Sequence, residues 1–147
     1  MTTTDDTARK AWMGLLARAA PQRLAELMPD LPDHAVLRPP EVGAVMVRGR
    51  AGATGAAFNL GEMTVTRASV RLSGGVVGHA WVQGRDKAHA TRAAVADALM
   101  QTDAAEALRA GVLTVLAAEA GAAQVRRAGK AAATRVEFFT LVRGEDQ

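Results

Sequence analysis

The spacing of apolar residues along this 147-residue chain changes from a helical period to a strand period and back again. Apolar positions from Trp12 to Ala19 recur at i, i+3, i+4 and i+7, which predicts a helix from about Asp5 to Ala19. Pro21 suits the first turn of a second, short helix that ends near Met28, because the amide missing from proline has no helical partner there. We expect Pro39-Pro40 to close this N-terminal helical unit.

Beyond Gly43 the apolar period becomes two, which is typical of strands with one buried face. A first strand begins there, and a glycine-rich loop at residues 49–55 follows it. Further strands are expected at residues 64–72 and at about 76–83. Short connections between them predict an antiparallel meander of three to four strands.

The last hairpin of this meander has two possible registers. A three-residue loop at residues 73–75 aligns the even positions of both strands, and Gly75 would supply its left-handed residue. This register brings Arg67 close to Trp81 on one face. The apolar residues that it gathers on the opposite face are Val70, Leu72, Val76 and Val82. A two-residue loop would scramble both faces, so we favour the three-residue loop.

The next part of the chain is expected to be helical. Asp86 can cap a helix over about residues 87–101, because its carboxylate can accept from first-turn amides. The positions expected to face inward are Ala88, Val95, Ala98 and Leu99. Asp103 followed three residues later by Glu106 predicts a capping box at the start of another helix.

That last helix should pack along one side, where its apolar residues are Leu108, Val112, Val115, Leu116 and Val125. Gly111, Gly121 and Gly129 each weaken a helix by about 1 kcal/mol relative to alanine, so breaks are expected there. Residues 136–142 fit a strand or an extended tail better than a helix. The whole predicts an α+β fold in a single domain, residues 1–147, with helices on both sides of the meander.

Composition limits the chemistry that the chain can carry. Cysteine is absent, which excludes disulfides, thiolate metal sites and thiol nucleophiles. The three histidines are not spaced as metal ligands, so we expect no metal site. No apolar run approaches the roughly 20 residues of a membrane span, and the N-terminus lacks signal-peptide features, so we expect a cytoplasmic protein without membrane contact.

The positive charge is concentrated in the middle of the chain. Residues 38–92 carry eight basic and three acidic side chains, a balance of +5 against +3 for the whole chain. If Arg48 and Arg50 lie close to Arg67 and Arg71, four guanidinium groups crowd one sheet face. Because like charges repel, water, carboxylates or phosphate must then lie against that face. Too few aromatic residues lie nearby for a nucleic-acid stacking surface. Trp81 suggests a desolvated protein contact instead.

Catalytic motifs are sparse. The glycine-rich loop lacks the Lys-Ser or Lys-Thr of a phosphate-binding P-loop, and a strand follows it, so a structural role is expected. Asp86 and His89 are weak candidates for acid–base work, since both fall at a helix start. The alternative reading of each is a structural residue.

Two stretches carry a family resemblance. The segment T-V-T-R-A-S-V-R-L-S-G-G-V-V-G-H-A-W-V-Q-G-R-D-K-A-H-A occupies residues 64–90, and A-D-A-L-M-Q follows at residues 96–101. The ending T-R-V-E-F-F-T-L-V-R-G occupies residues 134–144. Both stretches resemble the PhnG family of the bacterial carbon–phosphorus lyase system, and the similarity is thin across residues 103–133. His79 occupies a position that the family pattern leaves open.

The resemblance implies a part in a multi-subunit enzyme. Members of this family assemble with PhnH-, PhnI- and PhnJ-like subunits, two copies of each, and act with a PhnL-like ATP-binding-cassette-type protein. They are required when a phosphonate is joined to C1′ of the ATP ribose and adenine leaves. This chain would then be a non-catalytic or co-catalytic subunit of α-D-ribose 1-methylphosphonate 5-triphosphate synthase, a transferase. ATP would be a substrate of the complex, and the chain itself would bind no cofactor.

Within that reading, the residues expected to contact partners or phosphate are Arg48, Arg50, Arg67, Arg71, Trp81, Gln83, Arg85 and Lys87. We expect no residue of this chain to be an essential acid or base. A stand-alone nucleotide- or phosphate-binding protein is the alternative, and a nucleic-acid-binding regulator is a more distant one.

Overall fold

The computed structural model describes residues 3–136, with side chains described from residue 6 onwards except at residue 53. Residues 1–117 form one compact unit and residues 118–147 a second. The predicted terminal strand at residues 136–142 lies outside the described residues, except for Val136.

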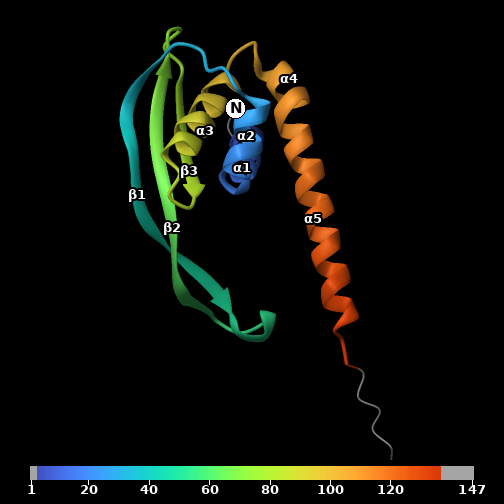
Figure 1. The fold of residues 1–147 in the computed structure, drawn as a ribbon. Coiled ribbons are helices and arrows are strands. Elements are labelled where there is room, and N and C mark those ends of the chain that lie inside the picture. The colour runs from blue at the N-terminus through green and yellow to red at the C-terminus, as the bar shows by residue number, and fades with distance from the viewer. Residues whose placement is uncertain (1–2, 137–147) are drawn as a thin grey trace, which may run out of the picture. The chain divides into compact units, whose positions relative to one another are not determined.

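The predicted α+β class is confirmed. The elements in chain order are α1 (Thr3–Arg18), α2 (Pro21–Leu27), β1 (His34–Arg50), a 3₁₀ turn (Ala51–Ala53), β2 (Ala57–Leu72), β3 (Val77–Gln83), α3 (Lys87–Leu99), α4 (Ala105–Leu108), a π-helical turn (Arg109–Leu113) and α5 (Thr114–Ala133). The three strands form an antiparallel sheet in the order β1-β2-β3, a simple meander (Figure 1).

The core lies on one face of this sheet. Helix α3 packs against β2 and β3, while α1 and α2 pack against α3 (Figure 1). Alternate residues of β2 and β3 face these helices, and their buried apolar members are Ala68, Val70, Leu72, Ala80 and Val82. Within the described part of residues 1–117, no helix covers the opposite face of the sheet.

Small residues allow α3 to lie unusually close to β3. Most of the buried residues of α3 are alanines, and the strand carries Gly78 opposite them. A Cβ atom added at Gly78 would lie 2.0 Å from the carbonyl oxygen of Ala94 and 2.6 Å from the amide nitrogen of Ala98. The alanine-rich composition therefore gives this core close backbone packing in place of large side chains.

The predicted register of the β2–β3 hairpin is confirmed. Leu72 donates its amide to the carbonyl oxygen of Val76 at 2.9 Å, which closes a three-residue loop. Gly75 has a φ of 88° in that loop, a conformation that glycine adopts without strain. Arg67 lies directly opposite Trp81, and all pairs join even with even or odd with odd positions.

The expectation that Pro39-Pro40 closes the N-terminal unit is wrong, because β1 runs through both prolines. The register against β2 shifts between Val36 and Arg38 and again between Arg38 and Glu41. These irregularities are β-bulges, where a strand has unpaired positions. Since β1 is an edge strand, two residues without amide hydrogens are tolerated at such positions.

The helix after β3 begins as predicted. Asp86 is its N-cap and its Oδ1 accepts from the amide of His89 at 2.8 Å. Val95 and Ala98 are buried and Leu99 is partly buried, but Ala88 is exposed, which corrects that assignment. The predicted capping box is also wrong. The N-cap of α4 is Ala104, and no side chain makes a cap hydrogen bond there.

The last helical run differs from its prediction at the glycines. Only Gly111 coincides with an irregularity, the π-helical turn, whereas α5 continues through Gly121 and Gly129. Leu108, Val112 and Leu116 are buried, but Val125 is 72% exposed, so the predicted apolar side ends near residue 116.

The run also corrects the expectation about membrane-length segments. Residues 105–133 are long enough and apolar enough to cross a membrane, with a mean hydropathy of 1.2 in the best window. Alanine supplies much of that value. Because the first part of the run is buried in the core of residues 1–117, ordinary packing accounts for its apolar residues there.

We predict that replacing Gly78 with alanine lowers the free energy of unfolding by about 3 kcal/mol, because backbone atoms of α3 cannot move aside as a flexible side chain would. Gly74→Ala is the matched control, since its added Cβ meets nothing within 4 Å, and it should cost under about 1 kcal/mol. Urea unfolding measures both values. Equal losses in the two variants would contradict the close packing of α3 on β3.

Candidate interaction face

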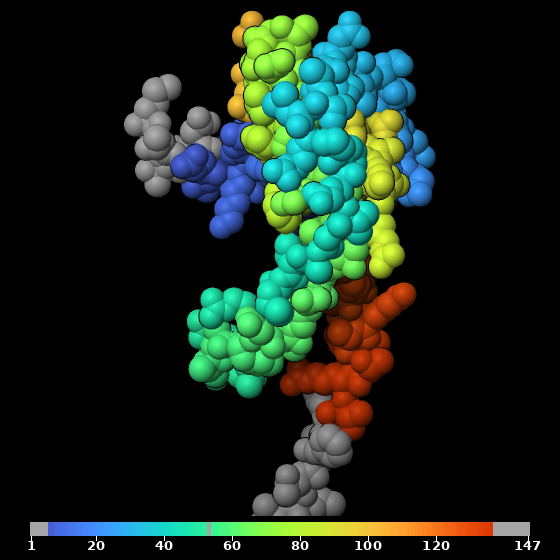
Figure 2. Space-filling view, turned by 90° about the vertical axis from the view of Figure 1, so that its left-hand side faces the viewer, coloured from blue at the N-terminus to red at the C-terminus, as the bar shows by residue number. Residues whose placement is uncertain are grey.

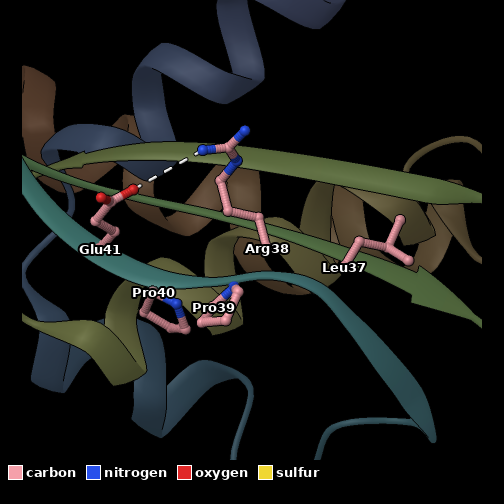
Figure 3. Close-up of a pocket in the computed structure, with 5 residues that line it drawn as sticks. All are labelled: Leu37, Arg38, Pro39, Pro40 and Glu41. Carbon is pink, nitrogen blue, oxygen red and sulfur yellow. Dashed lines mark ion pairs between the residues drawn. The ribbon is translucent and has the colours of Figure 1, made fainter.

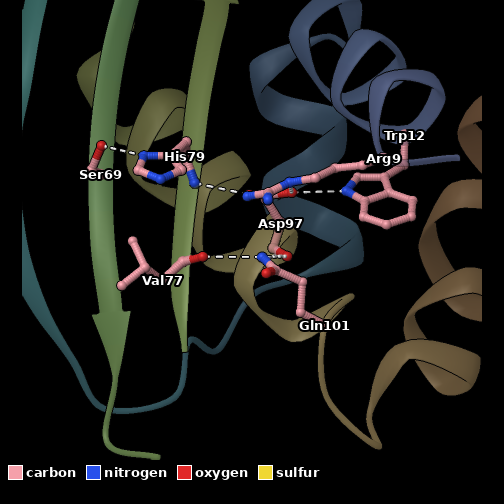
Figure 4. A network of polar contacts seen from close by, with 7 residues as sticks. All are labelled: Arg9, Trp12, Ser69, Val77, His79, Asp97 and Gln101. Atoms are coloured by element: carbon pink, nitrogen blue, oxygen red, sulfur yellow. Dashed lines mark hydrogen bonds and ion pairs between the residues drawn. The ribbon is translucent and has the colours of Figure 1, made fainter. Parts of the chain in front are cut away.

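A buried carboxylate fixes the position of the edge strand. Asp97 of α3 is fully buried and accepts from the Arg9 guanidinium at 3.2 and 2.7 Å and from the Trp12 indole Nε1 at 2.9 Å (Figure 4). The backbone amide of His79 donates to the same carboxylate at 2.9 Å. One side chain therefore joins α1, α3 and β3, which sets the position of every residue on β3.

Gln101 adds a second contact between the same helix end and strand. Its side-chain amide donates to the carbonyl oxygen of Val77 at 3.0 Å and to that of Asp97 at 3.0 Å (Figure 4). The edge of β3 is thus held to α3 by polar contacts at both Val77 and His79.

The opposite, uncovered face of the sheet carries an ordered cation–aromatic pair. The guanidinium carbon of Arg67 lies 5.6 Å from the ring centroid of Trp81, within the range of a cation–π interaction. Glu41 holds the same guanidinium, accepting from Nη2 at 2.8 Å and Nε at 3.1 Å. Trp81 remains 49% exposed, so a large aromatic surface is held in place while still open to a partner.

Glu41 stays ionised in this arrangement. The hydrogen bonds from Arg67, and then its charge, lower the pKa of the Glu41 carboxyl below its ordinary value. Arg38 contributes less, at 3.8 Å from the same carboxylate (Figure 3). An open depression of about 470 Å³ lies beside these groups, lined by Leu37, Pro39 and Pro40 as well as by the two charged residues.

A groove of about 500 Å³ lies on the other side of Trp81, against α1. Its apolar part is formed by Met13, Gly14 and Ala17, and its charged part by Asp6, Arg9 and Lys10. Trp81 therefore has a cation on one side and an open, partly apolar groove on the other. Trp and Arg of this kind are common anchors at protein interfaces.

A serine and a histidine also meet on the uncovered face. Ser69 Oγ lies 2.8 Å from His79 Nδ1, and His79 is exposed (Figure 4). The pair lies on an open sheet surface. It completes a row of polar side chains across β2 and β3, between the Arg67–Trp81 pair and Arg71.

The predicted cluster of four guanidinium groups does not form. The register places Glu41 opposite Arg67 and Ala35 opposite Arg71. Arg48 and Arg50 lie at the far end of β1, opposite Asn59 and Ala57, and alternation puts them on the other face of the ribbon. This separation follows from the register, which pairs Arg48 with Asn59, eight positions along β2 from Arg67. The bulge in β2 at residue 60, which has no clear mark in the sequence, decides which face the arginines lie on.

The remaining predicted contact residues lie where β3 passes into α3. Gln83 is exposed and pairs with Val65 at the end of the three-stranded region. Arg85 and Lys87 are exposed on either side of the capping residue Asp86. Gly84 has a φ of 90° and donates its amide to Thr64, which fixes this turn.

Asp86 and His89, the two candidates for acid–base work, both have structural contacts. Asp86 caps α3, as described above. His89 is 1% exposed, and its Nε2 lies 2.9 Å from the carbonyl oxygen of Leu16 in α1. Burial lowers the pKa of His89 below its ordinary 6.5, and its Nδ1 has no hydrogen-bond partner within the described structure. A neutral ring that donates from Nε2 fits these contacts.

Among the described residues, no group of three or more histidine, aspartate or glutamate side chains is arranged to hold a metal ion. The residues that sequence reasoning missed are Glu41, Asp97 and Arg9. Each contacts partners far away along the chain, so no local spacing could have identified them. An aspartate at an inward position of an alanine-rich helix was the one available signal for Asp97.

Comparison with known proteins supports a family assignment. A protein-family model described as "Phosphonate metabolism protein PhnG" matches residues 7–144. The α-D-ribose 1-methylphosphonate 5-triphosphate synthase subunit PhnG of Rhizobium meliloti (strain 1021) is 49% identical over 150 aligned positions, which cover 98% of this chain and 96% of that protein.

We predict that His89 makes the protein less stable in weak acid. Because the folded-state pKa lies below the unfolded value of 6.5, the unfolded state binds more protons as the pH falls past 6.5. The free energy of unfolding should then decrease by up to about 1.4 kcal/mol per pH unit, until the pH falls below the folded-state pKa.

Urea unfolding between pH 8 and pH 5 measures this slope. His89→Gln, whose amide can still donate to Leu16, should reduce the slope by more than the control His34→Gln, whose ring lies outside the core. An unaltered slope in His89→Gln would contradict the assignment of a neutral, buried ring.

Proposed function

Because this chain belongs to the PhnG family of phosphonate-metabolism proteins, we propose that it is a subunit of an α-D-ribose 1-methylphosphonate 5-triphosphate synthase. The 49% identity to such a subunit, which extends over nearly all of both chains, carries this proposal. An alignment without large gaps at either end supports a shared role for the whole chain, including the segments outside the described structure.

The reaction that the family implies is a displacement at the anomeric carbon of ATP. A phosphonate oxygen forms a bond to C1′ of the ribose, and the bond from C1′ to adenine breaks. Such a step needs an acid or base near the leaving group. In this chain the two candidates for that work are a helix cap and a buried ring, which supports a non-catalytic role.

The partners that we propose are PhnH-, PhnI- and PhnJ-like subunits, two copies of each, and a PhnL-like ATP-binding-cassette-type protein, in the cytoplasm. ATP would bind to the complex, and no cofactor would bind to this chain alone. A subunit needs ordered, exposed anchor residues at its contacts, and the Arg67–Trp81 pair has this character.

We place the principal contact at Trp81. The Glu41 carboxylate holds Arg67 over one side of the ring, so little side-chain freedom is lost when a partner covers it. Arg71, Gln83, Arg85 and Lys87 extend the same contact as polar and charged residues around it.

Replacing Trp81 with alanine should weaken assembly by at least tenfold, because truncating an anchor tryptophan at an interface commonly costs about 2 kcal/mol or more of binding free energy. Co-expression with the partner subunits, followed by size-exclusion chromatography and titration, measures the effect. Val36→Ala is the matched control, since Val36 is 52% exposed against 49% for Trp81. Equal assembly by both variants would contradict the placement of the contact at Trp81.

Replacing Asp86 with asparagine tests the non-catalytic role. Asparagine is also a good helix cap, so the variant removes the carboxylate and keeps the fold. Adenine release by the assembled complex should stay within about threefold of the wild-type rate. A loss of about 100-fold or more, with assembly intact, is typical of a missing acid or base and would contradict the proposal.

A further inference from the structure

The β1–β2 hairpin extends well beyond the three-stranded part of the sheet. Strand β3 pairs with β2 only from Val65 to Arg71, whereas β1 and β2 remain paired as far as Arg50 and Ala57. We call residues 44–64 the arm. Figure 2 shows the arm in blue-green and green, projecting away from β3 and from α1 to α3.

Helices α1 to α3 do not cover the arm (Figure 2). Of the side chains that the structure describes between residues 44 and 64, none is buried. A two-stranded ribbon without a packed face is only marginally stable in water. This ribbon nevertheless carries large apolar residues in the open, including Met46, Phe58, Leu60 and Met63, which are 53, 46, 66 and 37% exposed.

Most of these apolar residues share one face of the arm. Val45 pairs with Met63, and Val47 pairs with Gly61, on the face that continues the Arg67 side of the sheet. Phe58 pairs with Gly49 on that same face. Leu60 is the extra residue of a bulge, and its side chain lies 3.8 Å from the position that a Cβ atom of Gly49 would occupy. The apolar strip thus consists of Val45, Val47, Phe58, Leu60 and Met63.

The opposite face of the arm is basic. Arg48 and Arg50 lie there with Met46 and Glu62, and both arginines are exposed. The arm therefore carries one negative and two positive charges, and the positive ones lie near its tip. Arg50 also donates to the carbonyl oxygen of Gly55 at 3.1 Å, which orders the tip loop.

From this arrangement we propose that the arm inserts into a groove of another subunit of the synthase. The groove has an apolar wall against the strip and carboxylates opposite Arg48 and Arg50. This inference rests on the proposed function, since it requires the complex, and it names a second contact apart from Trp81. Covering both faces at once supplies the packed layer that the isolated ribbon lacks.

A shortened arm provides the most direct test. Replacing residues 46–62 with Asn-Gly leaves Val45 and Met63 paired across a two-residue hairpin turn, so the rest of the fold is retained. The isolated variant should melt within a few degrees of the wild-type chain, because no buried side chain is lost. Co-expressed with the partner subunits, it should bind at least tenfold more weakly.

Point variants separate the two faces. Phe58→Asp with Leu60→Asp addresses the strip, and Arg48→Glu with Arg50→Glu addresses the basic face. Each pair should weaken assembly at least tenfold. The loss caused by the arginine pair should shrink between 0.1 and 0.5 M NaCl, because screening removes charge repulsion. Val36→Asp is the matched control, since Val36 is 52% exposed on β1 outside the arm, and it should assemble normally.

The outcomes are distinguishable. If the wild-type chain fails to assemble with any partner subunit, the proposed function is wrong. If the wild-type chain assembles and the shortened and point variants assemble equally well, the arm proposal alone is wrong. Concentration-dependent dimerisation of the isolated chain that disappears in the Phe58→Asp, Leu60→Asp variant would show that a second copy covers the strip, and would also overturn it.

Discussion

The arrangement of this fold depends on one buried carboxylate. Asp97 is fully buried. Burying an ionised carboxylate destabilises the folded state by roughly several kcal/mol unless its oxygens accept hydrogen bonds. The donors come from Arg9, Trp12 and the amide of His79, which belong to α1 and β3. Satisfying the carboxylate therefore requires α1, α3 and β3 to meet at one point. Helices α1 and α3 are thereby placed on one face of the sheet, and no helix within the described part of residues 1–117 covers the other face.

The open face and the arm are consequences of that placement. With its apolar side already packed on α3, the sheet presents polar residues outward, and Glu41 orders Arg67 over Trp81 among them. The hairpin of β1 and β2 extends beyond α1 to α3, so its tip carries exposed apolar residues. Both features make sense in a protein whose surface is completed by other subunits, which agrees with its membership of the PhnG family.

Local signals predicted much of this structure from sequence. The cap at Asp86 and the three-residue loop with Gly75 follow from spacing within a few residues, and that loop sets the register in which Arg67 meets Trp81. The contacts of Asp97 span 18 to 88 positions and leave no such signal. The cluster of arginines failed because the hairpin loop next to Arg50 keeps Arg48 and Arg50 far along β1 from the partners of Arg67 and Arg71. A bulge in β2, which has no clear mark in the sequence, also puts them on the other face. The prediction that Pro39-Pro40 closes the N-terminal helical unit failed for a related reason, since prolines end a helix but can remain in a bulged edge strand.

The claim that the chain acts as one part of a larger enzyme is tested most directly by adenine release from ATP in the presence of methylphosphonate. Three samples suffice: the purified chain, its partner subunits without it, and all subunits together. The account predicts release only in the third sample, and binding of the chain to its partners under the same conditions. Release by the purified chain alone, or an undiminished rate when it is omitted, would contradict the account.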